Sequence, residues 1–382
     1  MFQFGTDLIN NANRILKKVE SSGYPYKNVA GSALLNIAYQ KLNFIQRGRR
    51  FLKLLLEASR NFSWTIERSG VKSHSIALVT TNRDDARKRF EAFLNNEDPD
   101  YVKYEKGSVR LRVLFSTVIQ SLFFIAKRKS LCELFILQAC RRRFEAALHC
   151  KELLNYKSLY VYNEFEEAAP EFIFAFREAV GLSDSKVICY VHGFPYWPRD
   201  DKSFSFSNVQ YVFSQIGDYV ADNYLVKERF LKVVNRFSNL TVDVNVMSAS
   251  FGCESNACKV DYSLESVTLC LSNRRWDDFN KSVFRLGGEI ENKLGITVYY
   301  RPHPSLSSSY LNGLNIENRG WLVNSDVDCS SLYIMYHSTL LFELELSGCK
   351  VVRLDDGALD DFGMQRDIIH SVDDLTEYFN GG

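Results

Sequence analysis

The chain reads Ile296-Thr297-Val298-Tyr299-Tyr300-Arg301-Pro302-His303-Pro304 in its C-terminal third. The β-branched and aromatic residues at the start of this stretch are typical of a buried strand, and the prolines then end the strand and stiffen the following turn. The carboxyl end of a strand is where open α/β sheets bind their ligands. The stretch therefore predicts one strand of a parallel sheet, with Arg301, His303 and Pro304 at the ligand-binding edge.

A second stretch further along the chain has the same design. The strand-like run 332–335 is followed by Tyr336-His337-Ser338-Thr339 and then by a helix-like segment, 340–346. Ser and Thr are preferred residues at a helix start. Their hydroxyls, with the N–H groups and the positive dipole end of a helix, also suit a phosphate, and the two uses are compatible. Together the two stretches predict a site for the phosphate of a nucleotide.

Strand and helix patterns alternate on both sides of these stretches, which is typical of parallel sheets covered by helices. Residues 247–266 are poor in bulky apolar side chains and are the expected linker, so we expect two Rossmann-like domains, 1–250 and 260–382. Long helical stretches are expected over residues 7–70 and 109–154. The remaining expected strands are 76–81, 159–162, 187–191, 209–213, 267–271 and 350–354, and the remaining expected helices are 84–94, 168–180, 218–230, 277–294 and 339–347.

Composition narrows the class of protein. The 382 residues are 46% hydrophobic and 24% charged with a net charge of +1, so no bulk electrostatic argument exists for binding nucleic acid. Nine cysteines without regular spacing argue against a disulfide framework and for a reducing, cytoplasmic location. The apolar run 111–126 falls short of the ~20 residues of a membrane span. Its basic flanks, and those of residues 47–56, leave open a peripheral contact with the inner face of the cytoplasmic membrane.

Histidines follow three of the expected strands, at positions 192, 303 and 337. Any one of them alone is more commonly a structural histidine, but three at equivalent positions favour a binding site. Arg301 can neutralise a phosphate or pair with a nearby carboxylate, and both interpretations stay open. Because Pro302 and Pro304 enclose His303, its turn is rigid, which suits a residue that holds an anion.

With these motifs described, a resemblance can be stated. Tyr300-Arg301-Pro302-His303-Pro304, followed later by Ser338-Thr339 before a helix, resembles the paired His-Pro and Ser/Thr motifs of bacterial sialyltransferases and of related transferases that use CMP-activated Kdo or other nonulosonic acids. Residues 158–193 look like the order of an acid followed by His-Gly in bacterial surface-polysaccharide transferases of GT-B fold. The resemblance covers about residues 158–354.

The resemblance implies an α/β, GT-B-like fold in which two Rossmann-like domains face a cleft, with extra N-terminal helices. Domain 1–250 would hold the acceptor and domain 260–382 the nucleotide sugar. The enzyme would transfer sialic acid, Kdo or a pseudaminic-type sugar from its CMP donor to lipopolysaccharide or capsule. No cofactor or metal is implied, because CMP leaves with less charge than a nucleoside diphosphate. The implied donor-binding residues are Arg301, His303, Pro304, His337, Ser338 and Thr339.

A positioned base that deprotonates the acceptor hydroxyl typically contributes ~10²–10⁴-fold to the rate. The residues leave its identity open among Glu164, Glu166, Glu167, His192 and Asp200. Two Asp-x-Asp triplets, at 98–100 and 326–328, match a form found in metal-dependent transferases, but such triplets arise readily by chance. The aspartate pairs 277–278, 355–356 and 360–361 are expected to be solvated charges at helix ends or in loops. Two alternative functions remain: another nucleotide-sugar or polyol-phosphate transferase of the same fold, and a glycan-binding relative without turnover.

Overall fold

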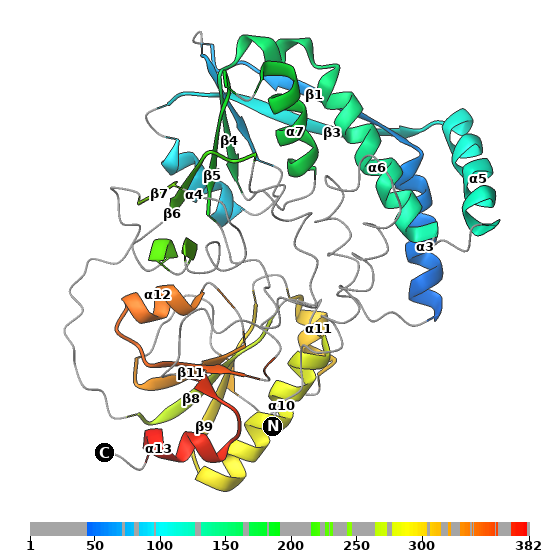
Figure 1. Cartoon of the computed structure of the whole chain (residues 1–382). Helices are drawn as coiled ribbons and strands as arrows, with labels where there is room; N and C mark the ends of the chain where they lie inside the picture. The colour runs from blue at the N-terminus through cyan, green and yellow to red at the C-terminus, as the bar shows by residue number, and fades with distance from the viewer. Residues whose placement is uncertain are drawn as a thin grey trace.

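The protein is a mixed α/β molecule with two largely parallel sheets (Figure 1). A computed structural model describes residues 44–70, 73–79, 84–94, 97–126, 131–162, 168–181, 183–191, 215–221, 226–228, 230–231, 243–246, 264–272, 277–303, 306–314, 320–321, 329–336, 338, 340–355, 357 and 368–379.

The first sheet has the strand order β1-β3-β2-β4-β5-β6-β7. All neighbouring strands are parallel except β1, which pairs antiparallel with β3. The order reverses between β2 and β4, which is the place where doubly wound sheets open a crevice at the carboxyl ends of their strands. The strands are β1 (Arg60–Glu67), β2 (Ser75–Leu78), β3 (Asp100–Val109), β4 (Ser158–Tyr162), β5 (Lys186–Tyr190), β6 (Asp218–Ala221) and β7 (Asp243–Val246).

Helices flank this sheet, and α6 packs on both α3 and α7. Helix α7 is buried on nearly every side, because its run of Phe, Ile and Ala residues lies between α6 and the sheet. The helical elements are α3 (Phe44–Ala58), α4 (Asp84–Phe93), α5 (Leu111–Ala126), α6 (Leu131–Leu148), the 3₁₀ turn η1 (Lys151–Asn155) and α7 (Ala169–Val180).

Two of the expected helices are wrong in part. Residues 60–67 form β1, in which Phe62 and Trp64 are buried and alternate with exposed Ser63 and Thr65, the period of a strand rather than of a helix. Residues 218–221 form β6 instead of beginning a helix, because their buried side chains complete the sheet beside β5. The expected strand 209–213 lies outside the described residues. Strands β3 and β7 had no counterpart in the sequence-based assignment.

The second sheet has the order β10-β9-β8-β11-β12-β13, and all its strands are parallel. Counted along the chain from β8, this is the order 3-2-1-4-5-6 of dinucleotide-binding Rossmann sheets. The strands are β8 (Ser266–Cys270), β9 (Thr297–Arg301), β10 (Gly320–Trp321), β11 (Ser331–Met335), β12 (Val351–Leu354) and β13 (Ile368–Ile369). The helices are α10 (Asp277–Leu294), α11 (Ser308–Asn312), α12 (Leu340–Leu346), η3 (Asp373–Leu375) and α13 (Thr376–Phe379).

The two faces of the second sheet pack against different helices. Leu269 and Tyr300 belong to an apolar cluster with Leu286 of α10. Side chains alternate along a strand, so Cys270 and Met335 face the other way and join a cluster that contains Leu341 and Leu344 of α12. That cluster also contains residues of the first unit, among them Phe172, Val226 and Phe230. The two α/β units therefore share apolar core, while the boundary near residues 250–260 remains a prediction.

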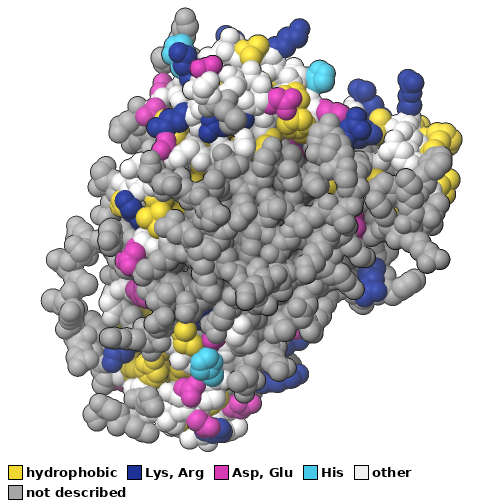
Figure 2. Space-filling view, in the orientation of Figure 1, with side chains coloured by type: hydrophobic (Ala, Val, Ile, Leu, Met, Phe, Trp, Pro, Cys, Tyr) yellow, Lys and Arg dark blue, Asp and Glu magenta, His cyan; other side chains and the backbone are white. Residues whose placement is uncertain are grey.

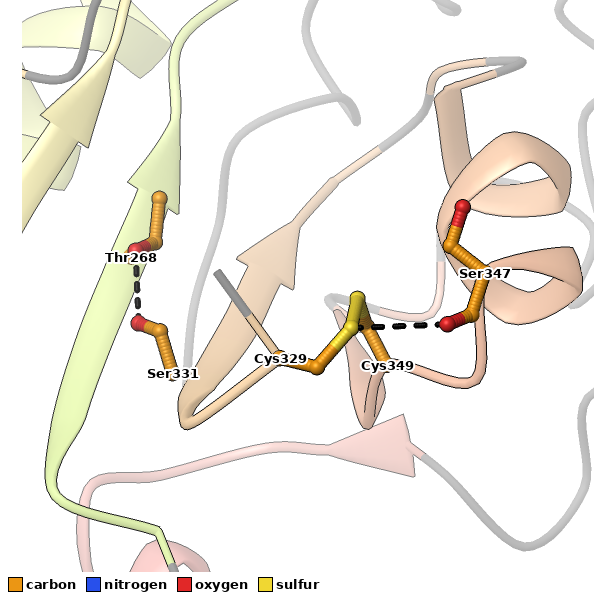
Figure 3. The surroundings of a disulfide bond; sticks show 5 residues. All are labelled: Thr268, Cys329, Ser331, Ser347 and Cys349. Atoms are coloured by element: carbon orange, nitrogen blue, oxygen red, sulfur yellow. Dashed lines mark hydrogen bonds between the residues drawn. A yellow bond between two sulfur atoms is a disulfide. The ribbon is translucent and has the colours of Figure 1, made fainter. Parts of the chain in front are cut away.

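A disulfide joins Cys329, just before β11, to Cys349, just after α12 (Figure 3). It closes a segment of 20 residues that includes the motif at residues 336–339. Beside it, Thr268 Oγ1 and Ser331 Oγ form a hydrogen bond of 2.6 Å between β8 and β11 (Figure 3). The cysteine spacing, which argued against a disulfide framework, did not reveal this bond, because a parallel strand–helix–strand unit returns distant cysteines to the same end of the sheet.

Candidate functional site

The candidate site lies at the carboxyl ends of β8, β9, β11 and β12. The strand order reverses between β8 and β11, so the crevice expected of such sheets opens there. Both motifs found in the sequence reach this edge, since His303 follows β9 and Ser338 follows β11. The described residues His303 and Ser338 thus lie at the carboxyl edge of one parallel sheet, while binding of a ligand there stays a prediction.

Arg301 is the last residue of β9 and is only 9% exposed. In register it lies opposite Cys270, the last residue of β8. Burial raises the pKa of the Cys270 thiol to about 12, while the charge of Arg301 acts in the opposite direction. Because Tyr300 faces α10, alternation places Arg301 on the α12 face of the sheet. A cationic side chain is thus held, largely desolvated, at the ligand edge.

His303 is half-buried and lies in the turn that leads from β9 to α11. Its carbonyl oxygen accepts a hydrogen bond of 2.9 Å from the Leu306 N–H, which closes the turn. Ser307 then caps α11, because its Oγ accepts a hydrogen bond of 3.3 Å from the Tyr310 N–H. Pro304 lies outside the described residues. The turn predicted around His303 is confirmed on both sides of that position.

Ser338 caps α12, as predicted from its place before an apolar helix. Its Oγ accepts a hydrogen bond of 3.2 Å from the Leu340 N–H, and its carbonyl oxygen accepts one of 3.3 Å from the Leu341 N–H. The side chain is exposed, so the hydroxyl can also meet a ligand. Helix α12 has only 7 residues, so its dipole offers an anion less than a long helix would. His337 and Thr339 lie outside the described residues.

His303 and Ser338 do not follow neighbouring strands. Strand β8 lies between β9 and β11, and adjacent strands are about 4.8 Å apart, so the two motifs start roughly 10 Å from each other. A ligand that touches both must therefore be longer than one phosphate group. A nucleoside monophosphate, laid across the end of β8, has the required length.

Arg353, which the sequence-based analysis did not select, is a further cation of this region. It lies on β12, is 2% exposed, and its Nε donates a hydrogen bond of 3.0 Å to the carbonyl oxygen of Tyr336. Val352 belongs to the apolar cluster on the α10 face of the sheet. Because side chains alternate along a strand, Arg353 lies on the opposite face, the same face as Arg301. The sequence contains a signal that could have singled out Arg353, because an arginine inside the apolar run Val351-Val352-Arg353-Leu354 is unusual for a buried parallel strand.

Asp355 differs from expectation as well. The pair Asp355-Asp356 was interpreted as solvated charge, but Asp355 is 1% exposed. One of its carboxylate oxygens accepts a hydrogen bond of 2.9 Å from the Gly357 N–H, and the other lies 3.8 Å from His370 Nδ1. The interpretation of Asp355 as a surface charge is wrong because the chain turns at Gly357 and folds the carboxylate inward.

The start of α10 is unsuited to an anion, although a Rossmann sheet often binds phosphate after its first strand. The first turn of α10 carries Asp277 and Asp278, whose negative charge already balances the positive end of the helix dipole. Tyr310 donates a hydrogen bond of 2.7 Å to Asp277, and Lys281 lies 2.6 Å from the same carboxylate. A phosphate is therefore better placed at the β11–α12 turn than at the β8–α10 turn.

No protein-family model matches this chain, and no curated protein is significantly similar to it. The candidate site is therefore assessed from its residues and its place in the sheet.

The other group of predicted residues belongs to the first unit. Glu164, Glu166 and Glu167 follow β4 in the chain, while His192 and Asp200 follow β5, and all five lie outside the described residues. The last described residue before the glutamates is Tyr162, at the carboxyl end of β4. Its ring stacks on that of Tyr190, the last residue of β5, with centroids 5.9 Å apart. The carboxyl edge of the first sheet is thus lined by aromatic rings next to its own reversal of strand order.

Asp100, in the triplet Asp98-Pro99-Asp100, has a structural role. It is 3% exposed, and its carboxylate accepts hydrogen bonds of 2.7 Å from the Ser69 N–H and 2.7 Å from the Tyr156 hydroxyl. It also lies at the amino end of β3, away from the ligand edge. Among the described residues, no cluster of three or more His, Cys, Asp or Glu side chains is arranged to hold a metal ion. The triplet 326–328 lies outside them.

Proposed function

We propose that this protein is a glycosyltransferase that moves a nonulosonic acid, of the sialic acid, Kdo or pseudaminic type, from a CMP donor to a bacterial surface glycan. The supporting observation is one of topology. In a sheet of Rossmann order, the His-Pro motif follows β9 and the Ser/Thr motif follows β11, so both lie at the same edge on either side of β8. The strand order reverses between β8 and β11, which is where such sheets bind ligands.

The donor side of the proposal uses groups at that edge. The Ser338 hydroxyl and the N–H groups at the start of α12 would bind the phosphate of CMP, together with His337 and Thr339, the neighbours of Ser338 in the chain. His303 would contact the same nucleotide from the far side of β8. Arg301 and Arg353, both buried at this edge, supply positive potential toward the phosphate as it departs with the bonding electrons.

The acceptor side requires a base. In the proposed reaction the acceptor hydroxyl attacks the anomeric carbon, the bond from that carbon to the phosphate oxygen breaks, and the hydroxyl proton passes to a carboxylate. Among the candidates, the glutamates after β4 are favoured over Asp200, because β4 ends at the reversal of strand order in the first sheet. Glu164 follows Tyr162 most closely and is the first residue to test.

The first experiment measures CMP release from CMP-sialic acid and CMP-Kdo, with and without glycan acceptors. His303→Ala is expected to lower turnover about 10²-fold, because it removes the group that would position the nucleotide from the far side of β8. His149→Ala is the matched control, since His149 is an exposed histidine at the end of α6 in the other unit. Turnover by His303→Ala equal to that of wild type would remove His303 from the mechanism.

A second experiment identifies the nucleotide by thermal shift with CMP, CDP, UDP and GDP. A ligand present at about 100 times its Kd stabilises the folded state by about 2.7 kcal/mol, which is readily seen as a higher Tm. We expect CMP to produce this shift. Stabilisation by UDP alone would instead indicate another nucleotide-sugar transferase, and binding of CMP-sugars without hydrolysis or transfer would indicate a glycan-binding protein.

A further inference from the structure

Helix α5 has large apolar side chains on its exposed side. Leu111 is 81% exposed, Phe115 69% and Leu122 64%, and Val118 and Ile119 are each more than 40% exposed. These five positions have the spacing i, i+4, i+7, i+8 and i+11, so they form one stripe along the helix. We call them the α5 stripe. In Figure 2, hydrophobic side chains gather at the right edge of the molecule, where Figure 1 places α5.

The most deeply buried of the described side chains of α5 are small and polar, unlike those of an ordinary surface helix. Thr117 and Ser121 are 1% and 6% exposed, and Ser121 Oγ donates a hydrogen bond of 2.7 Å to the Thr117 carbonyl oxygen. On the neighbouring helix α6, Gln138 donates a hydrogen bond of 2.6 Å to Gln120 of α5. Small residues and amide hydrogen bonds between helices, with large apolar residues outside, are typical of helices that contact lipid.

The exposed charged groups in the described part of α5 and of its neighbour α3 are cationic. Helix α5 contains no acidic residue, and its neighbour α3 contains only Glu57. Glu57 is directed inward, where it lies 3.8 Å from the buried Arg143. In the described part of α3 and α5, with the residue before α5, the exposed charged side chains are those of Arg47, Arg49, Lys53, Arg110 and Arg112.

The length of α5 determines how such a surface would meet a membrane. Its 16 residues extend about 24 Å, less than the ~30 Å of a bilayer core. Within the described residues, no helix has both the length and the apolar character needed to cross a membrane. A helix with an apolar stripe and basic flanks lies in the plane of the interface instead, with the stripe below the headgroups.

We propose that the α5 stripe and the adjacent cations of α3 form a docking surface for an anionic lipid bilayer. The exposed stripe supplies the apolar contact, and the exposed cations of α3 and α5 supply the attraction to negative headgroups. A protein partner would leave unexplained why the most deeply buried described residues of α5 are Thr117 and Ser121. The inference does not depend on the glycosyltransferase assignment, because α5 belongs to the first unit and carries none of the proposed site residues.

The test is flotation of the full chain with vesicles of phosphatidylcholine, alone or mixed with phosphatidylglycerol. We expect wild type to float with the mixed vesicles and much less with the neutral ones. Phe115→Glu combined with Leu122→Glu is expected to lower the partition coefficient about 100-fold, since two exposed apolar side chains no longer enter lipid. Arg49→Glu combined with Arg112→Glu is expected to lower it at least about 25-fold, at roughly fivefold for each lost cation.

Leu154→Glu is the matched control. Leu154 is 69% exposed, like Phe115, but lies in η1, beyond the opposite end of α6. It is expected to float as wild type does. Unchanged Tm values would show that each variant is folded. Equal flotation of wild type and the stripe variant would overturn the proposal. A dimer in sedimentation velocity that the stripe variant dissociates, without flotation of wild type, would assign the surface to a second copy and would overturn it as well.

Discussion

Arg143 on α6 and Glu171 on α7 form a buried ion pair, with Nη2 and Oε1 2.6 Å apart and side chains only 6% and 2% exposed. Burial acts to lower the pKa of Arg143, but the Glu171 carboxylate outweighs burial and holds that pKa well above its usual value. The Arg143 carbonyl oxygen also accepts a hydrogen bond of 3.0 Å from Trp64 Nε1. At the scale of single residues, this pair joins two helices and β1.

Loss of either partner should therefore be costly. Glu171→Leu or Arg143→Met alone is expected to lower the free energy of unfolding by about 3–5 kcal/mol, because Arg143 then keeps, of the described carboxylates, only Glu57, 3.8 Å away, or Glu171 is buried without its counterion. The double variant Arg143→Met with Glu171→Leu should recover much of that loss, since apolar residues of similar volume fill the space. Urea unfolding measures all three. If the decreases in the free energy of unfolding of the two single variants simply add up in the double variant, the two residues are not coupled.

Asp100 gives a pH dependence of known sign. Burial acts to raise its pKa, and the hydrogen bonds from Tyr156 and Ser69, with the charge of Arg68, outweigh burial and lower the pKa below its ordinary value. Its contribution to stability is therefore present above the unfolded-state pKa of about 3.9 and is lost as the pH falls through the lower folded-state value. Asp100→Asn should unfold more easily at pH 7, and its stability should fall less steeply than that of wild type below about pH 4.

Residue identities predicted local backbone features better than they predicted burial. Ser338 could be identified as a helix cap, and His303 as part of a turn, because local rules decide both. Arg353 was missed although an arginine inside an apolar strand is a visible signal, and Asp355 was missed because its burial depends on residues that come together only in the fold. The same holds for the pairing of Arg143 with Glu171, which are separated by η1 and β4.

At the scale of elements, α10 lies closely against β9 at one glycine. A Cβ atom at Gly287 would lie 2.9 Å from Tyr300 Cζ and 3.1 Å from Leu269 Cδ1, and it would overlap the Tyr300 hydroxyl. Tyr300 is fully buried and precedes Arg301. Close approach of this helix to the sheet thus helps to fix the end of the strand that carries His303.

Gly287→Ala should destabilise the protein by about 1–3 kcal/mol through overpacking, although alanine favours helix formation by up to about 1 kcal/mol. Gly48→Ala is the matched control, because Gly48 lies inside α3 with no atom within 4 Å of the added Cβ, so it should stabilise the protein. Adding Tyr300→Phe to Gly287→Ala removes the overlapping hydroxyl and should restore part of the loss. Thermal melting of the three variants checks the sign of each effect.

The disulfide between Cys329 and Cys349 should stabilise the β11–α12–β12 unit. For a closed segment of 20 residues, the chain-entropy contribution is about 3 kcal/mol. Peptide mapping without reductant should therefore recover Cys329 and Cys349 in one linked product, and a thiol reductant should lower the Tm. Cys329→Ser with Cys349→Ser should match the reduced wild type. A Tm that reductant leaves unchanged would contradict a stabilising role.

Regular elements with strong patterns were predicted well. The helix expected over 277–294 has those same bounds, and the strands expected near 267–271, 296–300, 332–336 and 350–354 each shift by one residue or less. Strands β1 and β6 were missed because their polar residues alternate with apolar ones over only a few positions, and pairing with β3 and β5 decides their conformation. Sheet order depends on contacts between distant strands and was not accessible from local pattern.

At the scale of the whole molecule, the apolar cluster shared by both units has a thermodynamic consequence. Tyr333 and Met335 of the second sheet belong to the same cluster as Phe172 and Phe230 of the first unit. Separation of the units would expose part of this core to water. We therefore expect a single cooperative transition in scanning calorimetry, shifted as a whole by CMP, and two resolved transitions would contradict it.

The position of β8 between the two motif-bearing strands makes the proposed donor site bipartite. A ligand that reaches both motifs brings its second half to the protein already tethered, so the second contact forms at a high effective concentration. Cytidine alone and inorganic phosphate alone would each meet one half of the site and gain nothing from the other. CMP joins the two parts. Its association constant should therefore exceed the product of the association constants of cytidine and inorganic phosphate, as for a chelating ligand.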